Sequence, residues 1–177
     1  MKKILVILMF VFLEIFPSVS YAQTPTSIPT PTPIKYNLPY PGMLPDNPLY
    51  KLKVLRDKAT LFLMRNPNRK AEYHLLLADK RIQMAKILVE RGKVDIAKET
   101  ALKGENEITL LVFLLKDERK KPTKELFDRV EKASLKHQEV LNRLAGEIEK
   151  KDKKTFETVI YFSNVNLEEL RKIYKNY

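Results

Sequence analysis

An apolar spacing of three and four residues recurs from residue 67 almost to the end of the chain, and it constrains the fold more than any other feature. Side chains three and four positions apart lie on one face of an α-helix, so this spacing is typical of helices that bury one stripe. The first long segment shows it in Ala71, Leu75, Ala78, Ile82, Ala85 and Val89. No comparable strand pattern is present, and the sequence therefore predicts an all-α fold.

Capping residues and prolines divide this pattern into helices. Asn47 and Asn66 each precede a proline, which places a capping residue before the first helical position. Gly92 is suited to the left-handed conformation that ends many helices. Pro122 and Thr123 begin a further segment, and Asp152 is a cap for the last one. These signals predict five helices, at about 48–65, 67–91, 93–119, 123–150 and 153–176.

Every connection between these helices is short, so neighbouring helices should be antiparallel. We therefore expect an up-down antiparallel bundle of about five helices. Ala101 and Gly104 should let the helices at 67–91 and 93–119 approach closely. The last helix is expected over 153–176; a break over 163–166 is an alternative, because Asn166 and the acidic residue three positions later resemble a capping box. The first helix is expected to bury one face, made of Leu52, Leu55, Ala59 and Phe62.

The first 22 residues have the composition of a secretory signal peptide. Lys2 and Lys3 precede an apolar stretch over 4–16, and Ser20 and Ala22 supply the small residues that signal peptidase reads. A membrane-spanning helix needs about 20 apolar residues, which this stretch does not reach. We expect cleavage before Gln23 and export to the extracellular space or the cell envelope. The alternative is a retained leader, and a membrane is expected as a partner only in that case.

A Pro/Thr-rich linker over 23–35 leads into a segment that combines prolines with large apolar residues. We call this segment, residues 36–47, the strap, and the domain that it opens spans 36–177. Too many prolines for a helix and too many apolar groups for a free linker favour an extended segment packed on the domain. The alternative is a recognition segment for a partner. Candidate binding residues in and beside the strap are Tyr36, Tyr40, Pro41, Met43 and Tyr50.

The residue types that carry most enzyme chemistry are scarce. The chain has no cysteine and two histidines, His74 and His137, so neither a four-ligand nor a three-ligand zinc site of Cys and His can form. The remaining candidates for acid–base work are carboxylates with basic neighbours, which favours ion pairs. They are Asp57, Asp79, Glu105 and Glu107. We expect a non-enzyme without a cofactor; a carboxylate-based hydrolase is the weak alternative.

A net charge of +11 points to anionic partners. In an up-down bundle, basic residues from several turns gather at one end, which we call the basic pole. Its candidate binding residues are Arg69, Lys70, Arg119, Lys120, Lys121 and Lys124. Only Tyr174 and Tyr177 could stack on bases there, so no specific recognition of nucleic acid is expected. A surface that only keeps the protein soluble is an equally good interpretation.

The strap and the following helices also carry recognisable motifs. The segments YNLPYPGMLPDNPLYKLK at 36–53, LADKR at 77–81 and TALKGEN at 100–106 resemble domain of unknown function 5667 over about residues 36–110. The resemblance implies an exported bacterial helical domain and supplies no activity. We therefore expect a structural or protein-interaction module of the cell envelope. The alternative is an electrostatic binder of anionic polymer or of a membrane surface through the basic pole.

Overall fold

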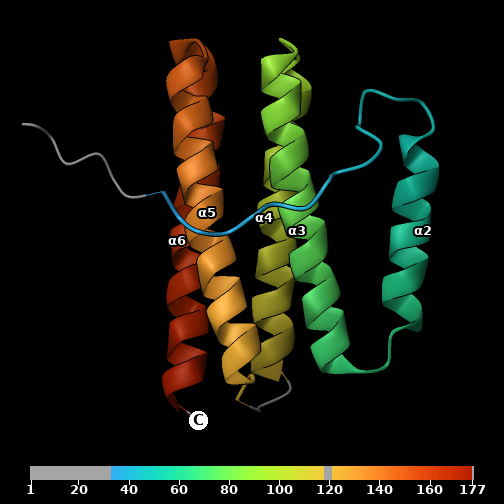
Figure 1. Ribbon diagram of the computed structural model, residues 1–177, viewed down its shortest axis with the longest axis vertical. Helices are drawn as coiled ribbons and strands as arrows, with labels where there is room; N and C mark the ends of the chain where they lie inside the picture. The colour runs from blue at the N-terminus through green and yellow to red at the C-terminus, as the bar shows by residue number, and fades with distance from the viewer. Residues whose placement is uncertain (1–32, 118–120, 177) are drawn as a thin grey trace, which may run out of the picture. The chain divides into compact units, whose positions relative to one another are not determined.

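The structure, a computed structural model, describes residues 33–117 and 121–176 (Figure 1). The predicted signal peptide and most of the linker lie outside these residues. The described part contains helices and no strands, which confirms the predicted all-α class. The helices are α2 (Tyr50–Leu63), α3 (Pro67–Glu90), α4 (Val94–Asp117), α5 (Lys124–Glu147) and α6 (Lys150–Asn176).

The ends of α3, α4 and α5 follow the capping chemistry in the sequence. The caps predicted at Asn47 and Asp152 are wrong, because α2 begins after Leu49 and α6 begins at Lys150, with Asp152 inside its first turn. The Asn66 side chain accepts a hydrogen bond from the Arg69 backbone N–H at 3.1 Å, and Thr123 caps α5 in the same way. Gly92 has a φ of 71°, the left-handed conformation that separates α3 from α4. The alternative of a break within α6 is wrong, since the helix is continuous from Lys150 to Asn176. Asn166 is buried and uses its side chain for contacts with α4, so it does not cap a helix.

Four helices form the bundle. α3 packs against α4 and α5, and α6 packs against α5 and α4, which places α4 and α5 diagonally (Figure 1). The pairs α3/α5 and α4/α6 therefore run parallel. Helices that are consecutive in the chain from α3 to α6 run antiparallel, as predicted (Figure 1).

The core consists of two apolar clusters along the bundle. One cluster includes Leu75, Leu111 and Leu170, and the other includes Ile82 and Phe156. Buried residues of α3 to α6 supply both clusters. The stripe predicted from Ala71 to Val89 is buried except for Val89, which is half-buried.

Helix α2 lies beside the bundle and does not contribute to either cluster (Figure 1). Of its residues, all of which are described, only Asp57 is buried. The prediction that Leu52, Leu55, Ala59 and Phe62 face a core is wrong. Their exposed fractions include 65% for Leu55 and 87% for Phe62. Buried residues of α3 to α6 form both clusters without α2, so the apolar stripe of α2 lies outside them.

Among the helices of the described part, none is long and apolar enough to cross a membrane.

Candidate functional site

The strap packs on the bundle through its tyrosine and leucine side chains. The Tyr36 hydroxyl donates a hydrogen bond to Asp79 Oδ2 at 2.6 Å. Partial burial and the Asp79 carboxylate raise the pKa of Tyr36, so the hydroxyl stays protonated and can donate. Leu38 packs on one core cluster, and Leu44 is buried. Tyr36, Leu38 and Leu44 thus bind the strap to the bundle.

The other predicted strap residues differ in their placement. The Tyr50 hydroxyl lies 3.9 Å from Met84 Sδ. Pro41 is buried, and its carbonyl accepts a hydrogen bond from Lys53 Nζ at 2.9 Å. The Met43 carbonyl also accepts from Lys53, at 3.4 Å, whereas the Met43 side chain is partly exposed. Tyr40 is 85% exposed, so it does not pack on the domain.

Polar side chains occupy the middle of the bundle. His137 Nε2 lies 2.8 Å from Asp79 Oδ1, and His137 is fully buried. His137 Nδ1 and the Ser134 hydroxyl have no hydrogen-bond partner among the described residues. The Asp79 carboxylate thereby joins α3 to α5 and to the strap through His137 and Tyr36.

Glu105 lies across the bundle on α4. Its Oε1 accepts a hydrogen bond from Asn166 Nδ2 of α6 at 2.6 Å, while Oε2 has no partner among the described residues. Burial raises the pKa of Glu105 to about 7, against the lowering effects of His137 and Asn166. A buried carboxylic acid that keeps its proton near neutrality can take part in proton transfer.

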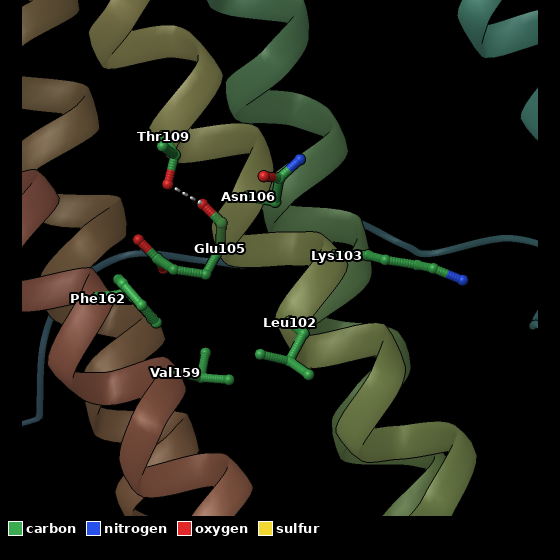
Figure 2. Close-up of a pocket in the computed structure, with 7 residues that line it drawn as sticks. All are labelled: Leu102, Lys103, Glu105, Asn106, Thr109, Val159 and Phe162. Atoms are coloured by element: carbon green, nitrogen blue, oxygen red, sulfur yellow. Dashed lines mark hydrogen bonds between the residues drawn. The ribbon is translucent and has the colours of Figure 1, made fainter.

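A groove of about 460 Å³ lies between α4 and α6 at Glu105 (Figure 2). Leu102, Val159 and Phe162 supply its apolar walls. Figure 2 shows the Glu105 side chain extending from α4 toward α6, whereas Lys103 points away from the groove. Because the carboxyl group is itself buried, a molecule in this groove would meet the apolar walls first.

A third set of polar side chains joins α3 to α4. One carboxylate oxygen of Glu107 accepts a hydrogen bond from Arg81, and the other lies 2.6 Å from His74 Nδ1. Burial opposes ionisation, but the hydrogen bonds and charges of His74 and Arg81 prevail and lower the pKa of Glu107. The arrangement is a buried ion pair that links two helices. The described residues contain no group of three His, Cys, Asp or Glu side chains that could hold a metal ion.

The predicted basic pole corresponds to one end of the bundle. The start of α3, the end of α4, the start of α5 and the end of α6 lie at one end of the bundle (Figure 1). Arg119 and Lys120 lie outside the described residues. Lys124 pairs with Asp128 at 2.6 Å, and Lys121 Nζ lies 4.3 Å from the centre of the Tyr174 ring.

Acidic residues are interleaved with the basic ones at this end. Glu72 pairs with Arg129, and Glu169 pairs with both Lys116 and Lys172. Of the remaining predicted residues, Arg69 is exposed and Lys70 is half-buried. Pairing on this scale reduces the positive field that the sequence predicts.

Sequence reasoning missed the outward face of α2, which we define as Leu52, Leu55, Ala59, Phe62 and Leu63. All five side chains are exposed. Lys51 and Lys58 border this stripe on one side and Arg56 borders it on the other, as their spacing along the helix requires.

The opposite face of α2 carries its buried acid. Asp57 Oδ1 accepts hydrogen bonds from Tyr73 of α3 at 3.2 Å and from Arg56 Nη2 at 2.7 Å. An aspartate opposite an apolar stripe, together with lysines along its border, was the sequence signal that could have placed this stripe outside.

A family model described as a domain of unknown function, DUF5667, matches residues 42–151, more than half of the chain. The match starts later than the resemblance in the sequence motifs and extends through α5. It leaves out the strap residues before Gly42. No curated protein and no solved structure matches the chain.

Proposed function

Because the chain belongs to the domain of unknown function 5667 family, we propose that it is an exported, non-enzymatic helical module that binds another component of the bacterial cell envelope. The family description supplies no activity, so the proposal has to rest on the chain's own surfaces. The observation that carries it is the outward face of α2.

This face is a contiguous apolar surface that the rest of the described chain leaves uncovered. Leu52 is 64% exposed, and Phe62 and Leu63 are more exposed still. Contiguous apolar patches with polar borders are typical of interaction sites, because water in contact with them is unfavourable unless a partner covers them. A partner that covers this face would explain why these apolar side chains are exposed in the isolated chain.

The buried polar residues support a structural role over catalysis. Asp79 bonds to Tyr36 and His137, and Glu107 bonds to His74 and Arg81. These bonds hold the strap and the helices together. The carboxylate-based hydrolase is therefore the weaker alternative.

Binding of an anionic polymer through the basic pole is the second candidate. The observation in its favour is the convergence of four helix ends at that pole (Figure 1). The acidic partners of Lys124, Arg129 and Lys172 speak against it. We therefore place the binding surface on α2.

Co-sedimentation with cell envelopes tests the proposal. The protein beginning at Gln23 should sediment with envelopes isolated from the producing bacteria. Phe62→Asp should release it, whereas Phe113→Asp should not. Phe113 is the control, because it is also an exposed phenylalanine on a helix, α4; it is 60% exposed, against 87% for Phe62. Equal sedimentation of the two variants would show that α2 is not the binding face.

A further inference from the structure

We infer that the outward face of α2 docks on the surface of a phospholipid membrane that carries anionic headgroups. The inference rests on the proposed function, which makes this face the binding surface, and it names the partner. It also revises the expectation that a membrane is a partner only if the leader is retained, since α2 lies in the mature chain.

The first argument is the distribution of side chains around α2. Residues 52, 55, 59, 62 and 63 follow the spacing of one helical stripe. The large apolar members are leucine and phenylalanine, and the charged residues at its borders are lysine and arginine. Helices that lie in the plane of a membrane interface have this composition, with the apolar stripe in the acyl boundary and the basic side chains at the headgroups.

The second argument is the sign of the charges. Asp57 is the only acid in α2, and it is buried and bonded to Tyr73 and Arg56. The exposed border residues Lys51 and Lys58 have no carboxylate within α2 that faces the same way. A partner that covers the stripe therefore meets positive charge and gains from carrying negative charge.

The third argument is the side from which α2 can be reached. The strap bonds to Lys53 and α3 bonds to Asp57, so both occupy the inward side of the helix. A groove that encloses a helix would need access to more of its circumference. A flat interface needs only the outward stripe. A second copy of the chain would bring two sets of lysines together, which opposes pairing of the stripes.

Vesicle flotation tests the inference. The protein beginning at Gln23 should float with vesicles of phosphatidylglycerol and phosphatidylcholine, and far less with phosphatidylcholine alone. Phe62→Asp should weaken partition into the anionic vesicles by about tenfold or more. The substitution removes a large apolar side chain from the membrane contact and places a negative charge next to the anionic headgroups. Phe113→Asp, which adds the same charge on α4, should leave partition unchanged.

A charge-reversal pair separates α2 from the basic pole. Lys51→Glu with Lys58→Glu should weaken flotation, whereas Lys121→Glu with Lys124→Glu should not. All the substituted side chains are exposed, so each variant should keep the helical circular dichroism and the melting temperature of the wild type. If Phe62→Asp fails this check, Leu55→Gln replaces it, because Leu55→Gln also removes an apolar side chain from the stripe and changes no charge.

Three results would overturn the inference. Equal flotation of Phe62→Asp and wild type would remove α2 as the lipid contact, and loss of flotation in the pole variant alone would move the contact to the basic pole. Absence of flotation, with envelope sedimentation still lost in Phe62→Asp, would make the partner a protein or a wall polymer. The proposed function would survive in that last case, so the two failures are distinguishable.

Discussion

At the scale of single residues, Gly104 sets how closely α3 and α4 approach. A Cβ atom at this position would lie 3.2 Å from Ile82 Cδ1 and 3.2 Å from Arg81 Cβ. Gly104→Leu should therefore overpack the contact and lower the free energy of unfolding by about 1–3 kcal/mol.

Gly146 near the end of α5 is the matched control for this prediction, because a Cβ atom there would have no neighbouring atom within 4 Å. Gly146→Leu should stabilise the protein slightly, since leucine has the higher helix propensity. Urea unfolding of both variants measures the difference. If the two leucines had the same effect, the contact between α3 and α4 at Gly104 would not be tight.

Glu105 makes stability depend on pH in a defined direction. Burial raises its pKa to about 7 in the folded protein, from a value of 4.5 in an unperturbed chain. Between these values the unfolded chain loses the proton and the folded protein keeps it. The contribution of Glu105 to stability is therefore fully present below pH 4.5 and falls by about 3 kcal/mol as the pH rises to 7.

Glu105→Gln tests this dependence, since the amide keeps an oxygen for Asn166 and cannot ionise. The free energy of unfolding of the variant, relative to wild type, should increase from pH 4.5 to 7 and then stay level. Urea titrations across this range measure it. A constant difference at every pH would mean that Glu105 ionises as readily in the fold as in the unfolded chain.

At the scale of elements, the strap offers two tyrosines with opposite expectations. Tyr36→Ala should lower stability by about 2 kcal/mol, because it removes a partly buried ring and leaves Asp79 with an unpaired oxygen. Tyr40→Ala should have no measurable effect, because Tyr40 is exposed. Thermal melts compare the two. Equal melting temperatures would show that the strap does not stabilise the bundle.

The predictability of the elements follows from what local signals encode. Asn66, Gly92 and Thr123 act within one turn of the chain, so they located the ends of α3, α4 and α5 well. An apolar spacing reveals a stripe but not what the stripe faces. The stripes of α3 to α6 meet each other, and the stripe of α2 meets none of them.

Adjacency was also beyond the sequence signals. The connection between α4 and α5 is short whether the two helices are neighbours or diagonal partners, so its length does not reveal that α4 and α5 lie diagonally and both pack against α6. The candidate site shows the same limit. Tyr36 and Tyr40 both belong to the proline-rich strap, yet only the first bonds to Asp79.

At the scale of the whole molecule, the proposed export predicts a defined mature end. The leader lies outside the described residues, and the prediction rests on Ser20 and Ala22 after the apolar stretch. The exported protein should begin at Gln23, which N-terminal sequencing or intact mass measures. An intact Met1 would favour a retained anchor.

The whole molecule should also open unevenly. Both core clusters draw on α3 to α6, so these helices share buried contacts and should unfold together. Helix α2 buries only Asp57 and depends on a few side-chain bonds, including those of Lys53 and Asp57. Its free energy of local opening should therefore be well below that of global unfolding.

Native-state hydrogen exchange measures this difference directly. Amides in the middle of α2 should exchange through a local opening that urea hardly accelerates, because little surface is exposed when α2 unfolds alone. Amides around Ile108 in α4 should exchange only through global unfolding, with a strong dependence on urea. Matching free energies and urea dependence in α2 and α4 would contradict the prediction, and would show that the strap couples α2 fully to the bundle.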